Sequence, residues 1–247
     1  MKSVNENHGT KSKIDYTDKK YIIKNVNSNV SSKLELNNEI AMLKALKEKF
    51  KYHAKILDME VDHFIKMEYI EGKLLADLFR LEIKFMSKKE LYQIAKNVAL
   101  TLTLFYKTGF FHNDLAATNI IIKHNSNEAY LIDYGRAGTD GCLQRDLGYF
   151  LSNIVKVRHK GNTYSNLLMY PKKCQFFIDV YFNMFESTDG FNKYRDFLKI
   201  IKEFFLFEMH FVKNRDFSGK IKLKIVLLIL PTILISNIKY LTRKFNI

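Results

Sequence analysis

The stretch FFHNDLAATNIIIK, residues 110–123, places His112, Asp114 and Asn119 in a segment that is otherwise apolar or small. It follows a long helical pattern that ends at Gly109. Further along, the segment YLIDYGRAG puts Asp133 at the end of an apolar run. Two carboxylates and a carboxamide therefore lie at the ends of apolar segments, where they can share one site.

Residues 119–123 (NIIIK) and 129–133 (AYLID) are short apolar runs joined by the turn HNSNE, which predicts a β-hairpin. Because hairpin strands are neighbours, we expect Asp114, Asn119 and Asp133 to converge on one small volume. Carboxylate and carboxamide oxygens suit Mg²⁺, which in turn suggests a polyphosphate. One acid left off the metal could accept a proton from an attacking hydroxyl. The set therefore predicts phosphoryl transfer.

A buried ion pair is predicted near the N-terminus. Residues 20–26 (KYIIKNV) indicate a strand that carries Lys24, and the helical pattern LELNNEIAMLKALKEKF follows it. Glu39 falls on the apolar face of that helix, where a carboxylate needs a partner, and Lys24 is the expected one. Lys19 and Lys20 are rivals for this role, and Lys47 projects to the same helix face.

Local signals give the boundaries of these elements. Ser32, with Glu35 three residues later, predicts a capping box for the first helix, whose apolar positions are 36, 40, 43, 46 and 50. Two strands are expected at 56–59 and 64–69, and a turn at Glu71-Gly72 ends the strand-rich part.

A second helix is predicted from Ser87, with Glu90 as its capping-box partner and Gly109 after its C-terminus. Its apolar positions are 91, 94, 95, 98, 102 and 105. From Leu147 onward nearly everything has the pattern of a helix. We therefore predict an α+β fold with two lobes and a cleft between them. Residues 1–70 form the small strand-plus-helix lobe, and residues 71–247 form the larger helical lobe with the catalytic hairpin 110–135.

Composition limits the class of protein. The chain has 247 residues, 47% hydrophobic and 14% aromatic, which is too rich for a disordered chain. Its net charge of +14 attracts polyanions without choosing among nucleic acid, acidic membranes, nucleotides and phosphorylated glycans.

The two cysteines, Cys142 and Cys174, do not have the spacing of metal ligands. We expect them to be reduced core thiols of a cytoplasmic protein, with a disulfide as the alternative.

The basic C-terminal segment, residues 213–247, contains eight Lys or Arg residues against the single acid Asp216. We expect either a buried helix pair with solvated flanks or an interfacial anchor on an anionic membrane. Its apolar run, Ile225 to Ile235, is too short to span a bilayer, and the N-terminus has no signal-peptide h-region. Nucleic acid is not favoured, because no aromatic-basic motif accompanies the charge.

The polar motifs resemble those of protein kinases. His112-Asn113-Asp114 followed by Asn119 looks like the catalytic loop H-x-D-x-x-x-x-N, and Asp133-Tyr134-Gly135 looks like the metal-binding D-F-G. The resemblance implies a bilobal protein-kinase-like fold that uses ATP and Mg²⁺, with Asp114 as the catalytic base and Asn119 and Asp133 as metal ligands.

The resemblance extends toward the N-terminus. It implies that Lys24 holds the nucleotide phosphates and that Glu39 pairs with it. In the segment MEYIEG, 67–72, it implies that the backbone of Glu68 to Ile70 hydrogen-bonds adenine. The pattern departs from the family in one place here: only Gly9 precedes the lysine strand where a glycine-rich loop belongs, and the usual first strand is nearly absent.

Further departures lie after the catalytic loop. Asn113 stands where regulated kinases have an arginine, and we expect it to be a loop residue, as we expect His112 to be structural. Only twelve residues separate Asp133 from Asp146, which leaves no room for an activation segment. Asp146 resembles the aspartate that anchors the catalytic loop from a helix.

The compact pattern is similar to that of lipopolysaccharide core and Kdo kinases, RIO-type atypical kinases, and aminoglycoside and choline phosphotransferases. It implies a kinase that transfers the γ-phosphate of ATP to a hydroxyl, and we favour a sugar hydroxyl of a lipopolysaccharide-type glycolipid. The alternatives are a RIO-like protein Ser/Thr kinase and a pseudokinase scaffold. The expected location is cytoplasmic, with peripheral contact to the inner face of a membrane if residues 213–247 bind lipid.

Overall fold

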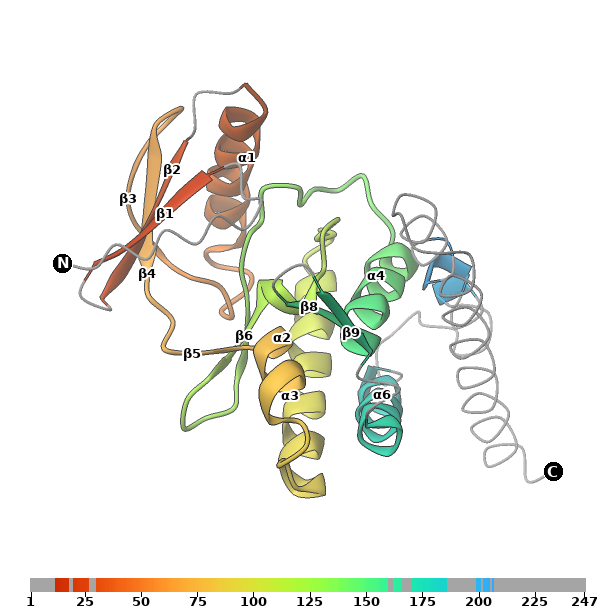
Figure 1. Cartoon of the computed structure of the whole chain (residues 1–247). Coiled ribbons are helices and arrows are strands. Elements are labelled where there is room, and N and C mark those ends of the chain that lie inside the picture. The colour runs from red at the N-terminus through yellow and green to blue at the C-terminus, as the bar shows by residue number, and fades with distance from the viewer. Residues whose placement is uncertain are drawn as a thin grey trace.

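The computed structural model describes residues 12–17, 20–26, 30–159, 162–165, 170–185, 199–200, 202–204 and 206. Figure 1 shows a small sheet with one helix at the upper left and a mainly helical part below it and to the right. The predicted α+β class, with a small antiparallel sheet and a larger helical part, is confirmed. The boundary between lobes at residue 70 stays a prediction. Residues 213–247 and Gly9 lie outside the described part of the chain.

The first sheet has four antiparallel strands in the order β1-β2-β4-β3. The strands are β1 (Ser12–Thr17), β2 (Tyr21–Val26), β3 (Ile56–Glu60) and β4 (Phe64–Glu68). Lys24 lies opposite the fully buried Ile65, so both side chains share the face of the sheet that packs on the first helix. The expectation that a strand is nearly absent ahead of the lysine strand is wrong, because β1 pairs with β2 along its whole length.

Helix α1 (Val30–Leu46) covers this sheet. Its predicted apolar positions are all buried, which confirms the helical period: Leu36, Ile40, Leu43, Leu46 and Phe50. The predicted ends are wrong. The helix begins at Val30, so Ser32 lies buried in its first turn rather than at the N-cap, and the helix ends at Leu46, before Phe50. Lys47 therefore lies in the turn that follows, where it is exposed.

A second sheet of three strands, β5-β6-β7, connects the two parts of the molecule. It contains β5 (Gly72–Leu74), β6 (Ile120–Lys123) and β7 (Ala129–Leu131). The predicted hairpin of β6 and β7 is confirmed, whereas the turn at Glu71-Gly72 is wrong, because Gly72 begins β5. A Cβ at Gly72 would lie within 2.4 Å of the Ile122 carbonyl oxygen, so only glycine permits this close approach.

The helical part is organised around helix α3 (Lys88–Tyr106). Its predicted capping box is confirmed: Glu90 N–H donates to Ser87 Oγ at 3.2 Å, and Ser87 N–H donates to Glu90 at 2.7 Å. The predicted apolar stripe is buried throughout, and α3 packs along helix α6 (Pro171–Phe185). The short helices α2 (Leu75–Asp77) and η1 (Leu78–Glu82) precede α3.

Helix α4 (Leu143–Val155) follows the second hairpin strand. The prediction of nearly continuous helix from Leu147 onward is confirmed for the rest of α4 and for α6. It is wrong between them, because β8 (Lys156–His159) and β9 (Asn162–Ser165) pair as a hairpin. A Cβ at Gly148 would lie 2.7 Å from the Glu203 Cβ and 3.0 Å from the Ile200 carbonyl oxygen, so α4 packs against these residues with almost no space between them. Among the described residues, no helix is long and apolar enough to cross a membrane.

Both cysteines are free thiols. Cys174 is buried in the core as predicted, and burial raises the pKa of its thiol to about 12. The prediction is wrong for Cys142, which is exposed at the start of α4.

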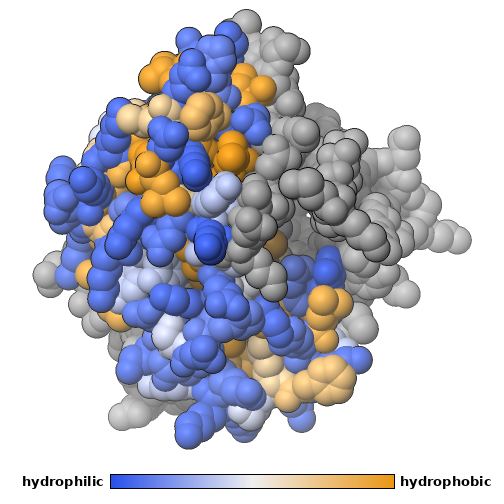
Figure 2. Space-filling model, turned by 90° about the vertical axis from the view of Figure 1, so that its left-hand side faces the viewer, coloured by the Kyte–Doolittle hydropathy of each residue, from blue (hydrophilic) through white to orange (hydrophobic). Residues whose placement is uncertain are grey.

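The face of the molecule on the side of the four-stranded sheet is mostly hydrophilic, as Figure 2 shows, with apolar groups gathered in smaller areas.

Candidate active site

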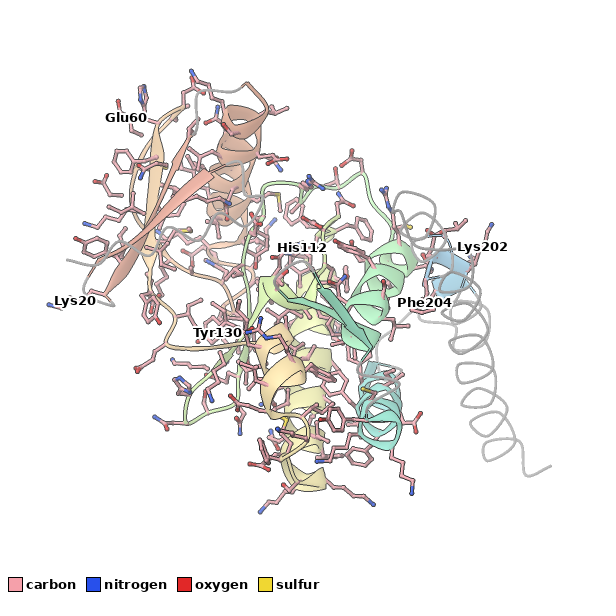
Figure 3. All side chains as sticks on the ribbon, viewed as in Figure 1. Lys20, Glu60, His112, Tyr130, Lys202 and Phe204 are labelled. Atoms are coloured by element: carbon pink, nitrogen blue, oxygen red, sulfur yellow. The ribbon has the colours of Figure 1, made fainter. Side chains whose placement is uncertain are left out.

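A lysine shared by two carboxylates connects the first sheet, α1 and the end of β7. Lys24 Nζ lies 2.6 Å from Glu39 Oε2 and 2.7 Å from Asp133 Oδ1. Glu39 is only 1% exposed and Lys24 15% exposed, so the pair lies in a medium where charges interact strongly. The predicted Lys24–Glu39 ion pair is therefore present. Lys24, and not Lys20, makes this pair, and Figure 3 shows Lys20 at the outer end of the sheet.

The protonation of this cluster follows from burial and charge. Burial raises the pKa of Glu39, and Lys24 opposes that rise. Burial favours the neutral amine of Lys24, but the neighbouring carboxylates of Glu39 and Asp133 outweigh it and raise its pKa. Burial also opposes ionisation of Asp133, whose pKa is nevertheless lowered by Lys24. The lysine therefore stays charged and holds Asp133 in its ionised form.

Asp133 lies just after β7 in a left-handed backbone conformation, with φ 63°. Such conformations are uncommon for residues other than glycine, although Asp and Asn adopt them more readily than most. The next residue, Tyr134, is buried, and its N–H donates to Glu39 Oε1 at 3.3 Å. The strained turn thus directs the Asp133 side chain toward Lys24 while Tyr134 packs inward.

Asp114 and Asn119 belong to the loop before β6. Asn119 ends a short 3-10 helix, Ala117–Asn119, and its Nδ2 donates to the Asp114 backbone carbonyl at 2.9 Å. Its backbone carbonyl accepts from the Ile132 N–H at 3.0 Å, next to Asp133. The structure therefore brings the three predicted polar residues to the same end of the hairpin.

The environment of Asp114 contains two residues that the sequence did not single out. Burial raises the pKa of Asp114, and Arg136, whose Nη1 lies 4.0 Å from Asp114 Oδ2, opposes that rise. Tyr149 on α4 also opposes the rise in the pKa of Asp114. Tyr149 lies three residues after Asp146 on the same helix, and this i,i+3 spacing was the signal that could have identified it.

Asp146 holds the catalytic loop in place, as expected from its position in the sequence. Its buried carboxylate accepts hydrogen bonds from the backbone N–H groups of His112 and Asn113 at 2.8 and 2.9 Å, and from the Tyr106 hydroxyl at 3.1 Å. Three donors satisfy a carboxylate that would be costly to bury alone.

His112 and Asn113 also have the structural positions that we expected. His112 is fully buried against Phe105 and Tyr134, with Nε2 3.1 Å from the Ile132 carbonyl oxygen. A hydrogen bond to that carbonyl requires the proton on Nε2. Asn113 has φ 59°, and its Nδ2 donates to the Arg136 carbonyl at 3.1 Å. It ties the catalytic loop to the segment after Asp133.

The segment expected to hold adenine connects β4 to β5. The N–H groups of Glu68 and Tyr69 donate to the carbonyls of Lys55 and Lys20, at 2.8 and 3.2 Å. Within the described part of the chain, the backbone N–H and C=O of Ile70 have no partner in the structure. Backbone contacts of Glu68 and Ile70 to adenine stay a prediction. Because the Glu68 N–H is bonded to Lys55, Glu68 could contact adenine only through its carbonyl oxygen.

The oxygen atoms of Asn119 and Asp133 are the donor type that Mg²⁺ prefers. Among the described residues, no group of three or more His, Cys, Asp or Glu side chains could hold a metal ion. Mg²⁺ is usually bound by one or two protein oxygens together with waters and substrate phosphates, and Asn119 and Asp133 fit that mode of binding.

Residues 9–140 match the protein kinase domain family. The chain is 23% identical over 133 residues to a probable serine/threonine-protein kinase, fnkE, of Dictyostelium discoideum. The match covers 52% of this chain and 10% of that relative.

The match to residues 9–140 covers more than half of the chain, and the chain therefore belongs to the protein kinase domain family. Members of this family generally use ATP and Mg²⁺, and the α+β architecture is that of the protein-kinase-like fold.

Replacing Lys24 by Met should destabilise the protein in a pH-dependent way. The buried Glu39 carboxylate would lose its partner, at a cost of roughly 3 kcal/mol in the free energy of unfolding near neutral pH. Because the pKa of Glu39 would then be raised further, folding would favour its protonated form, and stability would be lost as pH rises. Urea unfolding should show a larger loss relative to wild type at pH 8 than at pH 5. An equal loss at both pH values would contradict this.

Tyr134→Phe should leave the stability unchanged or increase it. The Tyr134 hydroxyl is buried and has no hydrogen-bond partner among the described residues, so its removal relieves about 1 kcal/mol of desolvation cost. Tyr106→Phe is the matched control, because it removes a hydrogen bond to the Asp146 carboxylate and should lower the midpoint of thermal unfolding. A destabilised Tyr134→Phe variant would show that this hydroxyl has a partner.

Proposed function

We propose that the chain transfers the γ-phosphate of ATP to an acceptor hydroxyl. The observation that carries this proposal is the cluster in which Lys24 joins Glu39 to Asp133, while Asp114 and Asn119 lie at the same end of the hairpin. This arrangement supplies a cation that can bind phosphate and oxygen ligands for Mg²⁺. It also supplies a carboxylate, that of Asp114, which is not needed as a metal ligand and can accept a proton. Positioning and charge neutralisation are what phosphoryl transfer requires from a protein.

The residues divide into two roles. Lys24, held by Glu39, would bind the α- and β-phosphates. In doing so it would give up its ion pair with Asp133, whose carboxylate could then contact the metal. Asn119 and Asp133 would hold Mg²⁺, which when bound neutralises charge on the phosphates. These assignments rest on the chemistry of each side chain and on its place in the cluster.

Asp114 would act on the acceptor. The acceptor oxygen attacks the γ-phosphorus, the bond from that phosphorus to the β–γ bridging oxygen breaks, and ADP leaves. Asp114 orients the hydroxyl and takes its proton. Arg136, 4.0 Å from this carboxylate, favours its ionised form.

For the acceptor, the relative's printed name favours a serine or threonine hydroxyl of a protein, in keeping with the RIO-like alternative. A sugar hydroxyl of a lipopolysaccharide-type glycolipid is the second candidate. It is favoured by the short connection from Asp133 to the start of α4 at Leu143, which leaves little chain to build a peptide platform. A cytoplasmic location and peripheral contact with an anionic membrane are part of this second proposal.

Asp114→Asn should separate binding from chemistry. Loss of the base should lower kcat by roughly 10²–10⁴, since a positioned acid or base contributes this much. Mg-ATP should still raise the midpoint of thermal unfolding, because Lys24, Asn119 and Asp133 are unchanged. An active Asp114→Asn variant would overturn the role of Asp114. A wild-type chain that shows no thermal shift at millimolar Mg-ATP would favour the pseudokinase scaffold.

The acceptor is tested by incubating the chain with γ-labelled ATP and, side by side, pools of protein, lipopolysaccharide-type glycolipid and aminoglycoside. We expect label in protein on serine or threonine, and none in any pool with Asp114→Asn as the control. Label that appears only in glycolipid would replace the first candidate by the second.

A further inference from the structure

Helix α1 presents three polar side chains, on two successive turns, to the segment that follows Asp133. Glu39 accepts from the Tyr134 N–H, Asn38 donates to backbone carbonyls of the same segment, and Glu35 lies beside Arg136. The Lys24–Glu39 pair is therefore one of several connections between α1 and this loop. The others belong to no family motif that the sequence contains.

Asn38 makes the most extensive of these contacts. Its Nδ2 lies 2.8 Å from the Ala137 carbonyl oxygen, 3.0 Å from that of Gly135 and 3.4 Å from that of Tyr134. A carboxamide nitrogen has two N–H groups, so the two shorter contacts are the principal hydrogen bonds. One side chain thus binds the carbonyls of Gly135 and Ala137, two residues of a turn in which the Ala137 N–H donates to the Tyr134 carbonyl at 3.0 Å.

Arg136 lies inside that turn and connects α1 to the catalytic loop. Its Nε is 3.5 Å from Glu35 Oε1, and its Nη1 is 4.0 Å from Asp114 Oδ2. Arg136 is 55% exposed, so neither contact holds the guanidinium firmly without help from its backbone. The Arg136 carbonyl accepts from Asn113 and the turn is held by Asn38, which together fix the backbone from which the side chain extends.

The backbone of this loop needs such support. Asp133 has a positive φ of 63°, and a conformation of this kind persists only where the surrounding structure holds it. Gly135 lies directly against α1, since a Cβ there would be 3.2 Å from the Glu35 backbone oxygen. The helix and the loop are thus in direct backbone contact at the position between Tyr134 and Arg136.

We propose that Asn38 and Arg136 are positioning residues that form a second connection between α1 and the catalytic centre, in addition to the Lys24–Glu39 pair. Asn38 fixes the turn 134–137, and the turn places Arg136 where it orients Asp114. The proposal rests on the proposed phosphotransfer function. It implies that α1 holds the acceptor side of the site through Glu35, Asn38 and Arg136, and the metal side through Glu39 and Lys24.

The test compares Asn38→Ala with Asn37→Ala in the full chain. Asn37 precedes Asn38 on α1 but bonds Asp62 in the turn between β3 and β4, so its removal leaves the contacts of α1 with the loop 133–138 in place. Asn38→Ala should lower kcat by about tenfold, because small misplacements of catalytic groups cost that much or more, while KM for ATP changes by less than about twofold. Asn37→Ala should keep the wild-type kcat.

Hydrogen exchange gives a readout that is independent of activity. Amides in peptides covering 133–138 should exchange faster in Asn38→Ala than in Asn37→Ala. The Ala137 N–H is hydrogen-bonded to the Tyr134 carbonyl, and the Gly138 N–H to the Phe111 carbonyl, and both bonds depend on the position of this loop. Arg136→Gln should lower kcat with KM for ATP nearly unchanged, and Arg136→Lys should recover part of it. If Asn38→Ala fails to fold, the half-exposed Arg136 variants carry the kinetic test.

Equal kcat and equal exchange in Asn38→Ala and Asn37→Ala would overturn the proposal, as would an Arg136→Gln variant with wild-type kcat. A wild-type chain that transfers no phosphate would instead refute the proposed function. In that case the exchange data alone decide the connection: faster exchange in Asn38→Ala supports it, and equal exchange overturns it.

Discussion

The rest of the structure depends on the burial of one carboxylate. Glu39 lies on the apolar face of α1 and is almost completely excluded from water, so its charge must be compensated within the protein. Lys24 supplies that compensation from the neighbouring strand and at the same time holds Asp133. The requirement to pair one buried charge thus fixes the helix, the sheet and the end of the catalytic hairpin relative to one another.

Much of the site could be predicted because its determinants are local. The hairpin of β6 and β7 follows from two apolar runs and a polar turn, and α3 follows from a capping box and a regular apolar period. Glu39 was identifiable because a charge on an apolar helix face needs a partner. The spacing of Asp114, Asn119 and Asp133 carried the family resemblance, which the match to residues 9–140 confirms at the level of the protein kinase domain.

What could not be predicted depends on tertiary contact. Asn38 is one polar residue among several on α1, and nothing in its neighbours shows that it faces three carbonyls. Arg136 and Tyr149 matter only because two loops and α4 meet at Asp114. The start of α1 was misplaced because VNSNVSS offers several residues that can cap a helix. The sequence around Gly72 predicts a turn because its strand partner, Lys123, is far away in the chain.

The way in which Asp146 binds the catalytic loop has a consequence for sequence variation. It accepts from the main-chain N–H groups of residues 112 and 113, which every amino acid except proline possesses. The identity of the side chain at 113 is therefore decoupled from the anchoring of the loop. Two restrictions remain at this position. One is the positive φ, which asparagine and glycine meet at low cost and β-branched residues do not. The other is the hydrogen bond from Asn113 Nδ2 to the Arg136 carbonyl, which a glycine would lose.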